Sequence, residues 1–377
     1  MLKRTLAFLL ASVFSLALFG CVSFGGKPEP TDTAVEVLFT DALTQVPTAE
    51  PTLAPTPTPS PAPTPEPTLA PWELPAEAYK CRANKVNIRT EANTQSDIVA
   101  SVGFEDEVAV IGSEGDFYMI CFDNEIRYCY SAYFVPADEK LYGYMPAWSE
   151  YKTDSDGNIV YESDGVTPVV LTSELIDIRL LMPELYIYQI FGAEENFTGR
   201  QLYARSVPVM QTGMALKFVE AAEEFAKDGY SIKLYDCYRP KSVQYILYDI
   251  IQDSRYIADP YKSASNHNRA AAVDITLLDA EGNELDFPTP MHTFGYIVHR
   301  DHDYMWTQEQ RNNVNYMTEV MLRHGFKSIT TEWWHFSDTD YPGYIVMDID
   351  MRDIPMYTAA EIYELTGGRF GTPSAEN

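Results

Sequence analysis

The sequence predicts an α+β protein in which a small all-β barrel precedes a larger mixed domain. Short β-like runs separated by Gly, Asp and Asn fill residues 78–137, and longer mixed segments begin near Leu171. A proline-rich stretch precedes both. Of the 377 residues, 46% are hydrophobic and 13% are aromatic, which is enough for two folded cores. We therefore expect two domains with unfolded connections.

The formal net charge of −28 limits the partners of the protein. A surface this acidic repels polyanions, which argues against nucleic acid and against anionic wall polymers. Small neutral or cationic substrates stay compatible with this charge.

A basic start and a long uncharged run open the chain. Lys3 and Arg4 precede uncharged residues from Thr5 to Gly26, and Gly20 stands directly before Cys21. Residues 1–21 look like a bacterial lipoprotein signal, which implies a mature protein outside the cytoplasm that is lipid-anchored to the cell membrane through Cys21. The alternative is an uncleaved transmembrane anchor, because the uncharged run is just long enough to span a bilayer.

Residues 22–77 are a predicted disordered linker rich in Pro and Thr. Between Pro47 and Pro75, eleven of 29 residues are proline, and no core forms from such a composition. A polyproline-like chain rises about 3.1 Å per residue, so this segment reaches on the order of 90 Å. That length suits a tethered protein that reaches through a cell envelope.

Five short β-like runs in residues 78–137 predict a small barrel. The stretches VNIRTEANTQSDIVASV, EGDFYMI and YCYSAYF resemble bacterial SH3-type domains. The resemblance implies peptidoglycan binding, and the alternative is a spacer barrel that binds nothing. Cys129 is interpreted as a core thiol, and the pairing of Cys81, Cys121 and Cys237 stays open.

Residues 138–170 are interpreted as a connector, residues 171–357 as the second domain and residues 358–377 as a C-terminal tail. The apolar spacing from Val209 to Asp228 predicts a helix. A strand-like SIKLYD follows and leads into CYRP, and a second helix is expected from Ser242 to Gln252. These alternating elements indicate an α+β domain.

One histidine of interest lies in SNHNRAAAVDITLLD. The alternating AAVDITLL predicts a strand that carries Asp274. His267 precedes it by seven residues, an odd number, so the two cannot share a face of one regular strand. His267 must project from the turn that feeds the strand, which lets its imidazole converge with the carboxylate.

The segment TTEWWHF places Glu332 and His335 three residues apart in a strand-like stretch. Residues three apart on a regular strand face opposite ways, so a bulge or local twist is needed to aim both at one site. Taken alone, the pattern is equally compatible with core Trp333 and Trp334, a buried His335 and a surface Glu332.

Considered together, these residues predict an open zinc site. Two imidazoles and one carboxylate, from His267, His335 and Asp274, leave a fourth position for water. Hydrolysis also needs a base for the water proton and a cation for the oxygen that becomes negative. Glu332 and Arg239 are the candidates, and one zinc ion per chain is expected.

Three motifs occur here in the order found in one family. They are the Tyr238–Pro240 turn, the Ser-x-His-(six residues)-Asp stretch and the Glu-x-x-His stretch. From Leu171 to Tyr357 the sequence resembles the D-alanyl-D-alanine dipeptidases of the vancomycin-resistance type, which are zinc D,D-peptidases. The resemblance implies a small central antiparallel sheet and a substrate that is D-Ala-D-Ala or a peptidoglycan stem peptide.

The resemblance also implies site roles that match those above. It makes His267, Asp274 and His335 the zinc ligands, Glu332 the catalytic base and Arg239 the transition-state stabiliser.

Two positions depart from the family pattern. Ala270 stands where the family commonly has Gly, which matters only if the backbone there needs a positive φ. His292, in LDFPTPMHTFG, stands where the family carries an Asp that holds the substrate's free amino group, and an imidazole pairs poorly with an ammonium. Asp286 is a candidate to compensate, and Ser265 is a further candidate substrate contact.

Two alternatives to a dipeptidase are a D,D-carboxypeptidase that acts on longer wall peptides and an inactive lipoprotein that binds or senses the wall. The presence of Glu332 argues against the inactive protein, because a dead enzyme has no physical need for the base. His299, His302 and His324 are interpreted as surface or core residues with no role in the site.

Overall fold

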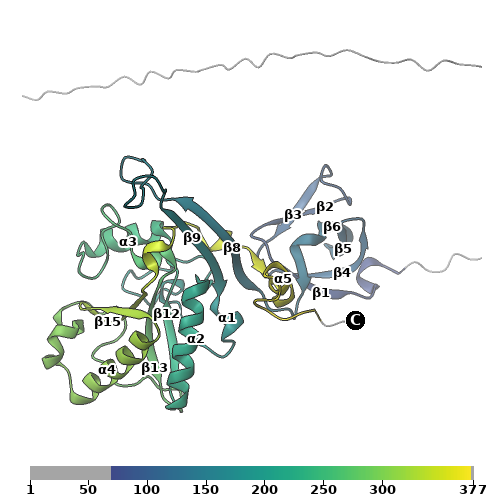
Figure 1. Ribbon diagram of the computed structural model, residues 1–377. Coiled ribbons are helices and arrows are strands. Elements are labelled where there is room, and N and C mark those ends of the chain that lie inside the picture. The colour runs from purple at the N-terminus through teal and green to yellow at the C-terminus, as the bar shows by residue number, and fades with distance from the viewer. Residues whose placement is uncertain (1–68, 375–377) are drawn as a thin grey trace, which may run out of the picture. The chain divides into compact units, whose positions relative to one another are not determined.

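The computed structural model describes residues 69–374 (Figure 1). The predicted lipoprotein signal, its Cys21 and most of the proline-rich linker lie outside these residues. Within residues 69–374, no helix is both long enough and apolar enough to cross a membrane.

The all-β part is one antiparallel sheet with the strand order β3-β2-β6-β5-β4-β1-β7. Its strands are β1 (Glu77–Cys81), β2 (Val86–Arg89), β3 (Ile98–Val102), β4 (Glu107–Glu114), β5 (Phe117–Phe122), β6 (Glu125–Tyr130) and β7 (Phe134–Pro136). In β2, Val86 and Ile88 are buried while Asn87 and Arg89 are less so, which is the alternation of a strand with one face on a core.

The expected barrel is not closed by strand pairing in the described part of the chain. The edge strand β3 pairs only with β2, and the three-residue β7 pairs only with β1, so the two edges of the sheet stay separate. The predicted core thiol is confirmed, because Cys129 is fully buried and its burial raises the pKa of the thiol to about 12. The four cysteines among residues 69–374 are all free thiols.

The centre of the mixed part is a five-stranded sheet with the order β10-β12-β13-β15-β14. The strands are β10 (Tyr186–Ile187), β12 (Ser231–Asp236), β13 (Ala272–Leu278), β14 (Phe326–Ile329) and β15 (Glu332–Asp338). All neighbours are antiparallel except β10 and β12, which agrees with the predicted antiparallel sheet apart from that one short pair. Every residue of β13 and β15 is buried, as expected for strands covered on both faces.

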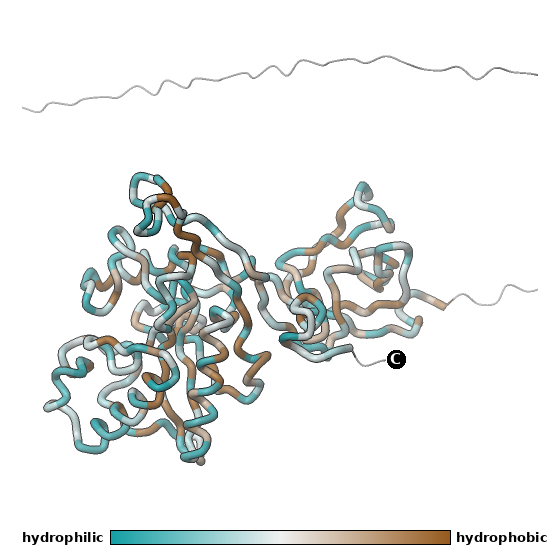
Figure 2. The backbone as a smooth tube through the Cα atoms, viewed as in Figure 1, coloured by the Kyte–Doolittle hydropathy of each residue, from teal (hydrophilic) through white to brown (hydrophobic). Residues whose placement is uncertain are grey.

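Helices α2 (Thr212–Lys227) and α4 (Gln308–Arg323) pack against this sheet (Figure 1). The other helices of the described chain are α1 (Ile178–Leu181), α3 (Lys241–Ile251) and α5 (Ala359–Leu365). The buried face of α2 carries Met214, Phe218, Ala221 and Phe225, the spacing of an amphipathic helix. Hydrophobic stretches follow the strands and helices of the interior, whereas the peripheral loops are mainly hydrophilic (Figure 2).

Several predicted boundaries differ from the structure. The first three residues of the helix expected from Val209 form the strand β11 (Val209–Gln211). The expected connector contributes β8 (Tyr142–Tyr151), which pairs with β9 (Val170–Asp177). Together with β16 (Met356–Tyr357), these strands form a second sheet of order β11-β9-β8-β16. The connector is therefore part of the fold, because Tyr144 on β8 is buried in the core.

The expected C-terminal tail also differs. Thr358 caps α5 by accepting a hydrogen bond from the Glu361 amide, and Ile362 and Phe370 are buried in the main hydrophobic core. A polar sequence with only two deeply buried side chains gave no strong pattern from which this docking could be predicted.

Candidate active site

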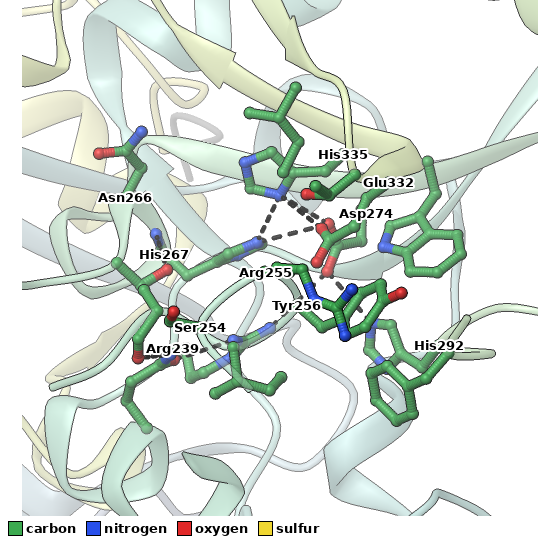
Figure 3. A pocket seen from close by; sticks show the side chains of 18 of the residues that line it. Arg239, Ser254, Arg255, Tyr256, Asn266, His267, Asp274, His292, Glu332 and His335 are labelled. Atoms are coloured by element: carbon green, nitrogen blue, oxygen red, sulfur yellow. Dashed lines mark hydrogen bonds and ion pairs between the residues drawn. The ribbon is translucent and has the colours of Figure 1, made fainter. Parts of the chain in front are cut away.

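The three candidate metal ligands lie close together (Figure 3). Two of them are on neighbouring strands, and the third is on the turn that precedes one of these strands. Asp274 on β13 and His335 on β15 are direct cross-strand partners. His267 lies on the short 3₁₀ helix Asn266–Arg269, which is the turn that feeds β13. Asp274 Oδ1 is 3.0 Å from His335 Nδ1 and 3.4 Å from His267 Nε2, and the two nitrogens are 3.2 Å apart. The structure thus brings together the three residues that the sequence analysis predicted as metal ligands.

The far side of each imidazole is held by a hydrogen bond. His267 Nδ1 donates to the carbonyl oxygen of Cys237 at 2.7 Å, which leaves Nε2 as an acceptor facing Asp274. His335 Nε2 lies 2.9 Å from Ser337 Oγ, and this hydroxyl also accepts a hydrogen bond from Asn266 Nδ2. Such outer contacts orient ligating histidines and fix their tautomers.

The protonation states suit a metal cation. Burial alone would raise the pKa of Asp274, but the charge of His267 and hydrogen bonds from three imidazoles lower this pKa well below its usual value. Burial lowers the pKa of His335, so its imidazole is neutral near pH 7. An ionised carboxylate beside two imidazoles is a donor set that zinc binds, so these residues fit that ion.

Glu332 lies beside this set, with Oε2 at 3.8 Å from His335 Nδ1. The side chain is buried, and burial followed by the charge of Asp274 raises the pKa of Glu332 well above its usual value. The expected strand irregularity is confirmed. Ser328 of β14 pairs with Phe336, whereas the next residue pairs with Glu332, so three residues of β15 bulge out of the pairing.

Arg239 follows the end of β12, and two neighbouring side chains hold its guanidinium. Its Nε and Nη2 donate to Asp236 Oδ2 at 2.9 and 2.6 Å, and its Nη1 donates to Gln244 Oε1 at 3.0 Å. Nη2 is 3.7 Å from Asp274 Oδ2. Burial would lower the pKa of Arg239, but Asp236 and other acidic neighbours raise it, so the guanidinium stays charged.

Asp236 is a supporting residue that the sequence analysis did not assign. It also accepts a hydrogen bond from Tyr203 OH at 2.9 Å and is fully buried. Its position three residues before Arg239, in DCYRP, was the available signal. Tyr203 lies in an irregular segment far away in sequence, so no pattern pointed to it.

His292 reaches the opposite oxygen of the central carboxylate. Its Nε2 lies 3.1 Å from Asp274 Oδ2, and its ring stacks on Phe191 with centroids 5.2 Å apart. The backbone of His292 has φ +55°, an uncommon value for a side chain other than Gly. His292 is therefore part of the site, next to the metal-ligand candidates.

The two remaining candidate substrate contacts behave differently. Ser265 lines the cavity, and its Oγ accepts a hydrogen bond from the His267 amide at 3.3 Å. The prediction for Asp286 is wrong. This residue is exposed, does not line the cavity, and accepts a hydrogen bond from Gln310 of α4 at 3.0 Å.

Ala270 adopts the backbone conformation that made its departure from Gly relevant. It has φ +52° and ψ +33° at the end of the 3₁₀ helix that carries His267. The residue is buried, and its carbonyl accepts a hydrogen bond from the Gln211 amide at 2.9 Å. A side chain in this left-handed region carries a conformational cost that Gly avoids.

A cavity of about 300 Å³ opens in front of these groups. Its walls include residues that the sequence analysis missed, because they lie on loops without a periodic pattern. They are Phe191, Phe197, Ser254, Arg255, Tyr256 and Phe294. Among the described lining residues, Asp274 and Glu332 are the only carboxylates.

A buried pair of imidazoles with a carboxylate, a second carboxylate beside them and a fixed guanidinium define a metallopeptidase-type centre on an α+β fold. The family model of the M15 peptidases, described as D-ala-D-ala dipeptidase, matches residues 171–353, and the bacterial SH3 domain model matches residues 84–135. This chain belongs to the D-alanyl-D-alanine dipeptidase family of peptidases and carries an N-terminal bacterial SH3 domain.

Curated relatives agree with the family match. The D-alanyl-D-alanine dipeptidase of Escherichia coli (strain K12) is 30% identical over 165 residues, which cover 44% of this chain and 84% of that protein. The D-alanyl-D-alanine dipeptidase of Enterococcus faecium is 28% identical over 174 residues, which cover 40% and 85%. The solved LdcB LD-carboxypeptidase shows 16% identity and a TM-score of 0.24 over 37% of this chain and 64% of its own.

Proposed function

We propose that this protein is an extracytoplasmic zinc peptidase that hydrolyses D-Ala-D-Ala or a related peptidoglycan peptide. The observation that carries the proposal is the buried set of His267, Asp274 and His335, with Glu332 Oε2 only 3.8 Å from His335 Nδ1. A ligand set and an adjacent buried carboxylate are the two parts that water activation needs.

His267 Nε2, Asp274 Oδ1 and His335 Nδ1 would hold the zinc ion. When bound, zinc supplies Lewis acidity to a water molecule and to the scissile carbonyl. The hydrogen bonds to the Cys237 carbonyl and to Ser337 keep both imidazoles oriented toward the ion.

Glu332 is the proposed general base. Its carboxylate lies beside the ligand set without belonging to it, so it is free to take a proton from the attacking water. The same carboxyl then delivers this proton to the leaving amine. Arg239 is the proposed partner of the oxygen that becomes negative, because its charge is permanent and Asp236 and Gln244 fix its position.

The cavity suits a small substrate. Its volume of about 300 Å³ lies at the lower end of the range of about 300–1,000 Å³ for small-molecule sites. Phe197, Tyr256 and Phe294 provide apolar walls for methyl side chains. These dimensions favour the last two residues of a D-alanyl peptide.

One observation favours a second candidate, a D,D-carboxypeptidase that acts on longer wall peptides. Asp274 and Glu332, the carboxylates of the described cavity lining, both face the proposed metal position. His292 approaches Asp274 from the other side. A free substrate ammonium would find no carboxylate of its own here, whereas a blocked amine carries no charge to compensate.

Three substrates separate these functions. Free D-Ala-D-Ala, its N-acetyl form and a muropeptide pentapeptide are offered to the same zinc-loaded preparation, and release of D-Ala is measured. We expect cleavage of the free dipeptide, with a loss on acetylation smaller than the roughly 3 kcal/mol expected for stranding a buried charge pair.

Release only from the blocked peptides would contradict the dipeptidase and favour the carboxypeptidase. Failure with all three substrates would favour an inactive protein that binds the wall.

We also propose that the chain is anchored through a lipid on Cys21. The supporting observation is the Gly20-Cys21 pair inside the uncharged run from Thr5 to Gly26. Cys21→Ala is expected to release the protein from the membrane fraction or to stall its processing. Unchanged membrane retention with an intact N-terminus would favour a transmembrane anchor.

Peptidoglycan binding by the SH3 domain is the remaining part of the proposal. The family match over residues 84–135 and the exposed rings of Tyr130 and Tyr133 support it. Residues 79–137 alone are expected to bind purified peptidoglycan with modest affinity in a pull-down. No binding at high protein concentration would leave this domain as a spacer.

A further inference from the structure

A second cluster of metal-binding side chains lies outside the catalytic cavity. His299, Asp301 and His302 belong to one short segment, and one donor atom from each lies within 4.8 Å of the others. None of the three lines the cavity or contacts the catalytic residues described above. The proposed peptidase function gives this cluster no role.

The backbone brings the two imidazoles side by side. His299 joins two 3₁₀ helices, Tyr296–Val298 and Arg300–Met305, and the His302 amide donates to the His299 carbonyl at 3.0 Å. The backbone is extended at His299 (φ −79°, ψ 134°) and kinked at His302 (φ −112°, ψ 25°). The rings of His299 and His302 are 5.4 Å apart and nearly perpendicular, at 86°.

Asp301 lies between these rings. Its Oδ1 is 2.8 Å from His302 Nδ1 and 3.7 Å from His299 Nδ1. The same nitrogen of both imidazoles thus faces one carboxylate oxygen. Two imidazoles and a carboxylate are a set that suits zinc, nickel and copper ions.

One side of the cluster is buried, and the other side is exposed to solvent. The His299 side chain is 6% exposed, and its Nε2 is 3.0 Å from Tyr256 OH, a contact of the kind that orients a ligating imidazole. The side chains of His302 and Asp301 are 27% and 59% exposed, so water or a small ligand can complete the coordination. Tyr296 stacks on the His302 ring at 4.9 Å.

The local charge permits a cation. Arg255 approaches this segment, since its Nη1 donates to Tyr296 OH at 3.2 Å. Its charge is balanced by Asp253, whose Oδ2 lies 2.6 Å from Arg255 Nη2. Asp301 therefore faces the two imidazoles without a Lys or Arg partner within ion-pair distance among the described residues.

The segment is tied to the strand that carries the catalytic groups. The Arg300 amide donates to the Thr330 carbonyl at 2.8 Å. The Arg300 guanidinium donates to the carbonyls of Glu332 and Trp333 at 3.2 and 2.5 Å. An ion bound by His299 and by Asp301 and His302 would be held by residues on both sides of Arg300. It would therefore restrain the hydrogen bonds of Arg300 to β15 and, through the contact of His299 with Tyr256, one wall of the cavity.

We infer that His299, Asp301 and His302 form a second site for a divalent transition-metal ion, separate from the catalytic centre. Its role is to brace the segment that clamps β15. The inference does not depend on peptidase activity, and it gives His299 and His302 a function that the sequence analysis did not.

Zinc stoichiometry tests the second site directly. The protein, free of any histidine tag, is dialysed to equilibrium against micromolar zinc, and bound metal is measured by elemental analysis. We expect about two zinc ions per wild-type chain, and about one per chain of His302→Ala, of Asp301→Ala and of His335→Ala. Within the cluster, only His302 and Asp301 are replaced, because both are at least partly exposed. His299 is left in place, since replacing a buried side chain could disturb the fold.

His324→Ala is the matched control. His324 is also a partly exposed imidazole beside carboxylates, with Nε2 2.7 Å from Glu224 and Nδ1 3.6 Å from Glu220. It belongs to no three-residue cluster in the described chain, so this variant should keep about two zinc ions. As a second readout, zinc should raise the Tm of His335→Ala but not that of His335→Ala combined with His302→Ala.

Three results would overturn the inference. They are one zinc ion at saturation of the wild type, two zinc ions retained by His302→Ala, and a second equivalent that binds only in the millimolar range.

Discussion

Glu332 lies next to the metal-ligand set without belonging to it. Its replacement should therefore affect turnover without affecting metal binding. We expect Glu332→Gln to keep its zinc and to lose turnover by about 10²–10⁴-fold, because the amide cannot accept the water proton. Elemental analysis and D-Ala release on the same preparation check both halves. The comparison variant is His335→Ala, which should lose the catalytic zinc. Equal metal loss in both variants would contradict the role of Glu332 as base.

The buried Glu332 also predicts how the metal-free protein responds to pH. Burial and the charge of Asp274 raise the pKa of Glu332 in the folded protein. Above about pH 4.3 the unfolded chain therefore binds fewer protons than the folded one, and stability falls as pH rises toward the raised pKa. Glu332→Gln lacks this ionisation. With a chelator present, its free energy of unfolding relative to wild type should rise with pH, by at most about 1.4 kcal/mol per pH unit.

Urea unfolding at about pH 5 and about pH 8 measures this difference. Zinc-loaded protein is the control, since a nearby cation favours the ionised glutamate and should reduce the effect. A difference that stays flat with pH in the metal-free protein would contradict a raised pKa.

Ala270 gives a stabilising prediction. Its φ of +52° lies in the left-handed region, and the residue is buried. Ala270→Gly should raise the free energy of unfolding by about 0.5–1 kcal/mol, because Gly adopts this conformation without strain. Ala221→Gly in α2 is the control and should destabilise by a similar amount. Urea unfolding of both variants provides the test.

Residue types and spacing carried most of the information about the site. An odd separation placed His267 on the turn before Asp274, and a separation of three required the irregularity that β15 shows. The contact between Asp236 and Tyr203 could not be predicted, because it joins an unpatterned loop to a strand end. The residues of the cavity walls were not predicted either, because they also lie on loops without a periodic pattern.

At the scale of elements, α5 shows why the chain end is not a tail. Ile362 is fully buried, whereas Leu365 on the same short helix is 51% exposed. Ile362→Ala should cost about 2–5 kcal/mol of stability, through lost burial and a residual cavity. Leu365→Ala is the matched control and should change stability by no more than about 0.5 kcal/mol. Equal small effects in urea unfolding would mean that α5 does not contribute to the core.

The strand β8 illustrates the limit of sequence patterns for elements. Its inner residues include Tyr144, but most of its other positions are exposed or half-buried, so the strand lacks the long alternation that predicts one. The central strands β13 and β15 had continuous apolar or functional residues and were recognised. The strands β13 and β15 could be recognised because all of their residues are buried, whereas most residues of β8 are not.

For the whole molecule, the second sheet determines where the peptidase part can begin. A chain that starts at residue 171 lacks β8 and leaves the long edge of β9 without its partner. We expect this chain to be insoluble or to unfold at a lower temperature than a chain that starts at residue 138, because an open edge strand promotes aggregation. Thermal unfolding and zinc content of the two chains check this. Equal stability would mean that residues 138–170 are only a connector.

The direct pairing of Asp274 with His335 makes the metal a reporter of strand register. Side chains alternate faces along a strand, so a slip of β15 by one residue against β13 would carry His335 to the opposite side of the sheet. A misregistered pair of these two strands thus cannot assemble the ligand set. Zinc held by the proposed ligand set would add its binding free energy to this one alignment of the two strands, and would thereby favour the correctly paired sheet over misregistered sheets.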